Sequence, residues 1–223
     1  MQSISRYFFL LKQLAQWQFV PLYLFGVLGT AGLVFSGLDW DYFVWMSSYD
    51  IRDWLRAADD AGFVLAFGLP PLVFLLALLT RKHVYRVYAA AITYSIVLGF
   101  TVSTFIKVFT GRTSPPLRRI FTGGEAVDNS HAFNFGFMQE QILGGWPSSH
   151  TTVATALATT LVIMLPIRWW YKVPIVATAL FIGIGVTLGF HWLSEFVAGA
   201  CLGVAIGLVV GRYYATRISS IFS

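Results

Sequence analysis

Long continuous runs of apolar residues, separated by short polar segments, dominate this chain. A helix needs about 20 apolar residues to cross the hydrocarbon core of a bilayer, and several runs reach that length. We predict spans near residues 19–38, 61–80, 84–106, 149–166, 173–190 and 192–211. The runs do not alternate with polar residues, as the strands of a membrane barrel would. The pattern therefore predicts an all-α polytopic membrane protein, a six-transmembrane-helix bundle that forms one domain over residues 1–223.

Two polar segments have the pattern of helices that lie at the membrane surface. Residues 3–18 form an amphipathic pattern typical of an interfacial helix. Aromatic residues in segment 39–60 are expected to form a belt on a second interfacial helix: Trp40, Tyr42, Trp45, Tyr49 and Trp54. The remaining long polar segment, 107–147, has about 40 residues, and loops of that length are usually functional or disordered.

Prolines and glycines modify two of the predicted spans. Pro70 and Pro71 lie inside the second span and should kink it. Glycines recur every four residues along the sixth span, at Gly199, Gly203, Gly207 and Gly211. Such a face permits close helix packing. We expect it to pack within the bundle; packing in a dimer is the alternative, and the sequence leaves the oligomeric state open.

Composition excludes a water-soluble globule. The chain is 57% hydrophobic and 11% charged, whereas soluble domains carry about 25% charged residues. The net charge of +5 is explained by cations at loop ends, so we expect a bilayer and no nucleic acid as a partner. Cys201 is the sole cysteine, which excludes an intrachain disulfide and a cysteine-only metal site.

Charge asymmetry predicts the orientation. One set of span ends carries cations and no acids: Arg6, Lys12, Arg81, Lys82, Arg86, Arg168, Lys172, Arg212 and Arg217. Segment 39–60, in contrast, contains six aspartates. The positive-inside rule then places both termini in the cytoplasm and segments 39–60 and 107–147 on the outer face. We expect a bacterial inner membrane with a periplasmic site; the endoplasmic reticulum fits the same physics. The first apolar run lacks a clear cleavage site and is expected to be a retained helix.

Polar residues from three distant parts of the chain meet at that outer level. Lys107 ends the third span, Ser148, Ser149 and His150 begin the fourth, and His191 lies between the fifth and sixth. Because the outer ends of the spans share one membrane depth, we expect these side chains to lie close together. Their chemistry, cations with hydroxyls and imidazoles, suits a phosphate group.

Each residue has a physical role in holding phosphate. Pro147 is suited to the first turn of a helix, where the missing N–H is not needed. The free backbone N–H groups that follow, together with the helix dipole, favour an anion. Ser148 and Ser149 add hydroxyl donors, while Lys107 and Arg112 supply positive charge, the arginine in a fork that matches phosphate oxygens.

Two histidines are candidates for the chemical step. His191 and Glu195 are four residues apart, on one helix face, so the carboxylate can fix the imidazole tautomer and prepare His191 to attack phosphorus. His150 is placed to protonate the departing oxygen. Cations and amides can hold the phosphoryl charge, so we expect no metal and no cofactor. A zinc site from His150, His191 and Glu195 is a weaker alternative, because local ligand spacing is absent; His131 has the pattern of an ordinary loop residue.

These residues resemble the type-2 phosphatidic acid phosphatase superfamily, whose pattern has three parts: K-x6-R-P, P-S-G-H and S-R-x5-H-x3-D. Residues 107–115 read K-V-F-T-G-R-T-S-P, and residues 147–150 read P-S-S-H. The third part is present as His191 and Glu195. The resemblance covers about residues 107–211 and implies a six-span lipid phosphatase.

The resemblance also implies roles for individual residues. His191 is the nucleophile, Glu195 its partner and His150 the general acid. Lys107, Ser148 and nearby backbone amides hold the phosphate.

The chain departs from the pattern at several positions. Ser114 and Gly185 occupy the two arginine positions. Ser149 replaces glycine, Glu195 replaces aspartate, and Ile184 replaces serine. A buried charged hydrogen bond is worth roughly 1.5–3 kcal/mol, so the loss of two arginines would slow a phosphatase unless other cations replace them. We expect Arg112 to compensate for one arginine. Arg118 and Arg119 have the pattern of charges that contact lipid headgroups or solvent, and folding back of one of them to replace the other arginine is the alternative.

The sequence thus predicts a membrane enzyme that hydrolyses a lipid phosphate or diphosphate through phosphohistidine. Undecaprenyl diphosphate, phosphatidylglycerol phosphate and phosphatidic acid are candidate substrates. A lipid phosphotransferase is a close variant, and a catalytically weak lipid-phosphate-binding or lipid-transport protein is the alternative. A channel or proton-coupled carrier is disfavoured, because few charges lie deep within the spans.

Overall fold

The computed structural model describes residues 2–50, 52–116, 126–139 and 145–222. Within those ranges the regular structure is helical and contains no strand, which confirms the all-α prediction. The helices are α1 (Gln2–Leu14), α2 (Val20–Phe35), α3 (Leu38–Ser47), α4 (Arg52–Phe63), α5 (Leu69–Thr80), α6 (His83–Thr110), α8 (Ser149–Met164), α9 (Trp169–Gly185) and α10 (Leu193–Phe222). Shorter elements are η1 (Trp17–Phe19), the π-helical turn η2 (Val64–Gly68) and η3 (Val186–Leu188).

Membrane-crossing helices follow the predicted runs with shifted boundaries. Among the residues that the structure describes, five helical stretches are long and apolar enough to span a bilayer, and α8 is a shorter apolar helix. The five are Trp17–Phe35, Asp53–Thr80, His83–Thr110, Trp169–Leu188 and Leu193–Ile221. The first ends before residue 38 because Gly37, with a φ of 79°, turns the chain into α3. An integral membrane protein is therefore supported at the level of its helices.

The second span is longer than the apolar run that predicts it. Helix α4 continues through η2 into α5, so the helical stretch starts in the polar segment rather than at residue 61. Pro70 and Pro71 lie in the first turn of α5, directly after η2. A proline lacks a backbone N–H and crowds the preceding turn, and a π turn is one way to absorb that irregularity. The irregularity thus lies where the prolines predict it.

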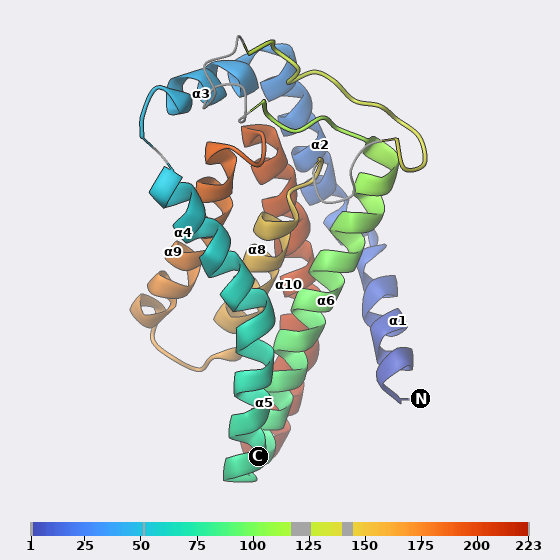
Figure 1. The fold of residues 1–223 in the computed structure, drawn as a ribbon. Coiled ribbons are helices and arrows are strands. Elements are labelled where there is room, and N and C mark those ends of the chain that lie inside the picture. The colour runs from blue at the N-terminus through green and yellow to red at the C-terminus, as the bar shows by residue number, and fades with distance from the viewer. Residues whose placement is uncertain (1, 51, 117–125, 140–144, 223) are drawn as a thin grey trace.

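Helix α8 is the centre of the bundle, with α6, α9 and α10 packed around it (Figure 1). Most of its residues are alanine, threonine or other small side chains, and ten of its positions are buried. Small side chains let neighbouring helices approach closely. The largest apolar cluster forms where α10, α6, α1 and α2 meet, and it includes Leu98, Leu202, Ile206 and Tyr214.

The glycine face of α10 packs against α8, as expected. A Cβ on Gly203 would lie 1.9 Å from the Thr155 hydroxyl oxygen, and one on Gly207 would lie 2.6 Å from the Ala156 carbonyl oxygen. The four glycines therefore allow contact between the two backbones. Because α8 covers this face, it is not available to a second copy of the chain.

Helix α1 forms where an interfacial helix is predicted, but it packs along the bundle. It contacts α10 and α6, and it contributes Leu10 and Leu14 to the core. Helix α3 carries Trp40, Tyr42 and Trp45 at the end of the bundle opposite to the N- and C-terminal ends (Figure 1). The position of either helix at a membrane surface stays a prediction.

We predict that Gly203→Ala destabilises the protein, because the added methyl group overlaps the backbone of α8. Overpacking of this kind costs about 1–3 kcal/mol. Gly32→Ala is the matched control, since nothing lies within 4 Å of a Cβ there. Thermal unfolding of the detergent-solubilised protein measures the difference. Equal midpoints for the two variants would contradict the close packing of α8 on α10.

Candidate active site

The predicted polar residues converge at the end of the bundle near α3. Lys107 lies in the last turn of α6, His150 in the first turn of α8, and His191 directly before α10. The imidazole rings of His150 and His191 have centroids 6.0 Å apart. The structure thus brings together two histidines that are 41 positions apart in the sequence.

His191 and Glu195 form a buried pair across one helical turn. The Nδ1 atom of His191 is 2.5 Å from Oε2 of Glu195, with the two side chains 3% and 0% exposed. The backbone N–H of His191 donates to the Val186 carbonyl, which fixes the chain as it enters α10. Because Nδ1 faces the carboxylate, Nε2 is the nitrogen whose lone pair is available for attack. This arrangement suits a nucleophile with an orienting base, and that role for His191 stays a prediction.

The surroundings of His191 favour its neutral form. Burial lowers the pKa of His191 below its ordinary value of 6.5, and the hydrogen bond to Glu195 acts in the opposite direction. The positive charges of Lys107 and Arg112 lower this pKa further. A neutral imidazole is the form that can act as a nucleophile.

His150 has one engaged and one unengaged ring nitrogen. Nε2 lies 3.1 Å from Oδ1 of Asp59, which is on α4. Nδ1 is buried and, among the described residues, has no hydrogen-bond partner. Both side chains are partly exposed, at 35% for His150 and 41% for Asp59. The sequence alone does not single out Asp59, which is one of six aspartates in segment 39–60.

The two serines of the predicted phosphate site also have structural roles. Ser148 is fully buried and caps α8, with its hydroxyl oxygen accepting from the Thr151 backbone N–H at 3.4 Å. Its own N–H donates to the Glu195 carbonyl at 3.1 Å, which joins the start of α8 to α10. The Ser149 hydroxyl pairs with that of Ser103 at 2.9 Å. Phosphate binding by either serine stays a prediction.

Arg112 is buried in a charged cluster beside Glu195. Its Nη2 donates to Asp39 at 2.7 Å and to the Ser130 carbonyl at 2.6 Å, while Nη1 donates to the Ser194 hydroxyl at 2.6 Å. Nη1 is also 3.7 Å from Oε1 of Glu195. The hydrogen bonds to Asp39, Ser130 and Ser194 therefore use Arg112 to join segments around the site. A direct contact between Arg112 and phosphate stays a prediction.

Asp39 is a second residue near the site that the sequence alone does not single out. It is fully buried and accepts hydrogen bonds from the Ser194 backbone N–H at 2.9 Å and hydroxyl at 2.5 Å, as well as from Arg112. Asp39 thereby caps the start of α10, which begins at Leu193, two residues after His191. Nothing in the sequence distinguishes Asp39 from the other acids near it.

The structure gives a physical reason for one departure from the family pattern. A Cβ on Gly185 would lie 2.2 Å from the Cβ of Ala58, because α4 packs directly against α9 there. An arginine therefore does not fit at this position without movement of α4. Ser114 is exposed, and its carbonyl accepts from Asn129. Arg118 and Arg119, the alternative replacements, lie outside the described residues.

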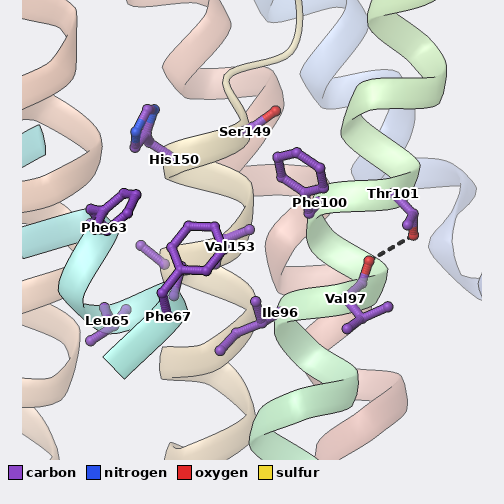
Figure 2. A pocket seen from close by; sticks show the side chains of 13 residues that line it. Phe63, Leu65, Phe67, Ile96, Val97, Phe100, Thr101, Ser149, His150 and Val153 are labelled. Carbon is purple, nitrogen blue, oxygen red and sulfur yellow. Dashed lines mark hydrogen bonds between the residues drawn. The ribbon is translucent and has the colours of Figure 1, made fainter. Parts of the chain in front are cut away.

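An apolar cavity of about 270 Å³ opens beside His150. Figure 2 shows Ser149 and His150 at one end, with Phe63, Phe67 and Ile96 further along. The walls come from α4, η2, α6 and α8. Nearly all of the lining is apolar, so the cavity suits a hydrocarbon chain rather than a water-soluble group.

No cluster of three or more histidine, cysteine, aspartate or glutamate side chains with the arrangement of a metal site is found in the parts of the chain that the structure describes. The zinc alternative with His150, His191 and Glu195 therefore gains no support. A metal-free mechanism stays a prediction.

We predict that Asp39→Ala strongly destabilises the protein, because it removes the carboxylate 2.7 Å from the buried Arg112 guanidinium and leaves only the more distant Glu195 at 3.7 Å. Breaking one side of a buried ion pair costs about 3–5 kcal/mol. Asp41→Ala, on the exposed face of the same helix, is the control. Thermal melts in detergent compare the two variants. A loss no larger than that of Asp41→Ala would contradict the role of the ion pair.

Comparison with known proteins supports the family. No curated protein and no solved structure matches the chain. The family model described as PAP2 superfamily matches residues 88–219, more than half of the chain, including Lys107, His150, His191 and Glu195. Members of this superfamily are generally phosphatases that act on lipid-like phosphates. The chain therefore belongs to the PAP2 superfamily.

Proposed function

We propose that this protein is a membrane phosphatase that hydrolyses a lipid phosphate or diphosphate through a phosphohistidine at His191. The observation that carries the proposal is the buried His191–Glu195 pair, which faces a second histidine with its ring centroid 6.0 Å away. A binding site alone does not need a nucleophile with an orienting carboxylate. Membership of the PAP2 superfamily supports the same reaction class.

The cavity beside His150 supports a lipid substrate. Its apolar walls lie between α4, η2, α6 and α8, with the histidine at one end (Figure 2). A lipid with its hydrocarbon chain in this cavity would present its phosphate at the polar end of the bundle. Phosphatidic acid, phosphatidylglycerol phosphate and undecaprenyl diphosphate all have this form.

The reaction would proceed in two steps. Nε2 of His191 attacks phosphorus while His150 gives a proton to the oxygen of the leaving group. Water, deprotonated by His150, then hydrolyses the phosphohistidine. Lys107 and the backbone N–H groups at the start of α8 would stabilise the phosphoryl charge, as a helix N-terminus does for anions.

The missing arginines favour a second candidate function. Asp39 neutralises Arg112, Gly185 has no space for a longer side chain, and Ser114 is exposed. A protein with this weaker anion site would bind or transport a lipid phosphate with little turnover. Transfer of the phosphoryl group to another lipid, in place of water, is the remaining variant of the enzyme.

The distribution of cations along the chain supports a membrane orientation. Arg81, Arg168 and Arg217 lie at the ends of the spans on one side, and the positive-inside rule places such ends, and with them both termini, in the cytoplasm. The site would then face the outer leaflet, the periplasmic side of a bacterial inner membrane. An epitope tag at the C-terminus that is accessible from outside intact cells would overturn this orientation.

We predict that the purified protein releases inorganic phosphate from at least one lipid phosphate or diphosphate, and that EDTA does not prevent it. His191→Ala should lower kcat by at least about 10³-fold, because it removes the attacking atom. His131→Ala, in an exposed loop position, is the control. No release from any substrate of the panel excludes the enzyme, and release abolished by EDTA excludes the metal-free mechanism.

We predict that the acidic limb of kcat/KM lies below pH 6.5. His191 must be neutral to attack, so activity falls as the pH drops through its lowered pKa. Glu195→Gln should shift this limb to still lower pH while it reduces kcat, because the carboxylate raises the pKa of His191. The profile is measured after correction for the ionisation of the substrate phosphate. A limb above pH 6.5 contradicts the assignment.

A further inference from the structure

A second carboxylate–imidazole pair lies beside the first. Asp59 on α4 approaches Nε2 of His150 at 3.1 Å, while Glu195 approaches Nδ1 of His191 at 2.5 Å. Asp59 lies outside residues 88–219, the part of the chain that the family model covers. It is therefore a feature of this chain that the family motifs do not describe.

The contact determines which nitrogen of His150 can face the substrate. Nε2 is occupied by Asp59, so Nδ1 is left, and it is buried without a hydrogen-bond partner among the described residues. A Cβ on Gly62 would lie 3.1 Å from Cδ2 of His150, so α4 also packs against the edge of the ring. The ring is thus held from one side, with His191 near it at a centroid distance of 6.0 Å.

We propose that Asp59 is a positioning residue for the general acid His150. Its Oδ1 lies 3.1 Å from Nε2, and in the proposal it accepts a hydrogen bond from Nε2–H of the protonated ring, which leaves Nδ1–H for the leaving oxygen. A protonated imidazole is a donor at both nitrogens, and Asp59 provides the acceptor for the one that the substrate does not use. The proposal rests on the proposed phosphatase function.

The proton balance is complete without another reactant. As His191 attacks and the phosphorus–oxygen bond breaks, the Nδ1 proton of His150 moves to the departing oxygen, and the neutral ring retains its Nε2 proton on the side of Asp59. In the second step Nδ1 accepts a proton from the water that attacks the phosphohistidine. His191 is released together with inorganic phosphate, and His150 is again protonated.

The position of Asp59 also connects the acid to the lipid cavity. Helix α4 continues into η2, whose Leu65, Ala66 and Phe67 line the cavity next to His150. The same helical stretch therefore carries the residue that orients the acid and the wall that would contact the hydrocarbon chain.

Stability alone does not account for the pair. The Asp59 and His150 side chains are 41% and 35% exposed, and ion pairs that solvent reaches contribute little to folding. Replacing Asp59 by asparagine should therefore leave the protein folded, which makes its effect on the reaction measurable.

The test compares substrates that differ in their need for an acid. With phosphatidic acid the leaving group is the diacylglycerol alkoxide, which must be protonated. With a prenyl diphosphate the leaving group is the prenyl monophosphate, and with p-nitrophenyl phosphate it is p-nitrophenolate. Both of these are good leaving groups without protonation. Asp59→Asn should lower kcat at least about 10-fold with phosphatidic acid, a part of the 10²–10⁴-fold that a general acid supplies. With the other two substrates the change should stay within about threefold.

Asp60→Asn is the matched control, because the neighbouring aspartate is exposed and has no contact with His150 in the structure as described. Its kcat should equal that of the wild type with every substrate. In a His150→Ala background, Asp59→Asn should have no further effect, since a positioning residue acts through the side chain that it holds.

Two results would overturn the proposal. One is an equal loss with all three leaving groups, which indicates a structural role; the other is no loss with phosphatidic acid. Either result counts only if the wild-type protein is active and the His191→Ala variant has lost that activity. A wild type that hydrolyses none of the three substrates contradicts the proposed function instead, so the two failures are distinguishable.

Discussion

The close packing of α8 against α10 is the constraint on which the site depends. Glycines at four-residue intervals on α10 let the backbones touch, and a Cβ on Gly199 would already lie 2.7 Å from the Ser148 carbonyl oxygen. At the polar end the Ser148 N–H donates to the Glu195 carbonyl, so the two helix starts are joined directly. This contact brings His150 and His191 to the same level. Larger side chains on this face of α10 would separate the two histidines.

A buried ion pair holds the other side of the site. Asp39 comes from α3, Arg112 follows α6, and Ser194 lies in the first turn of α10. Their mutual hydrogen bonds join three segments that are distant in sequence. Burying such charges is costly unless each is paired, so the cluster forms only when all three segments are in place. The His191–Glu195 pair therefore lies next to a buried charged cluster of Asp39, Arg112 and Ser194, which fixes the start of α10.

The two histidines have different surroundings. His191 is buried, with Glu195 beside its Nδ1 atom. Burial lowers the pKa of His191 and so favours the neutral ring. His150 is partly exposed, lines one end of an apolar cavity and lies 3.1 Å from Asp59. In the proposed mechanism a nucleophile must be neutral and an acid must carry a proton, and each ring has its own carboxylate, Glu195 for His191 and Asp59 for His150.

Sequence by itself determined the helical class, most of the spans and the residues of the proposed chemistry. Long apolar runs report on helices because a bilayer leaves backbone groups no other partner. His191 and Glu195 are four apart in a helix, so their contact follows from local geometry. The structure decided that Arg112 pairs with Asp39, that His150 meets Asp59, and that Gly185 has no space for an arginine. These contacts join residues more than 70 positions apart, and no periodic pattern encodes them. They depend on how the helices pack, which only the tertiary structure defines.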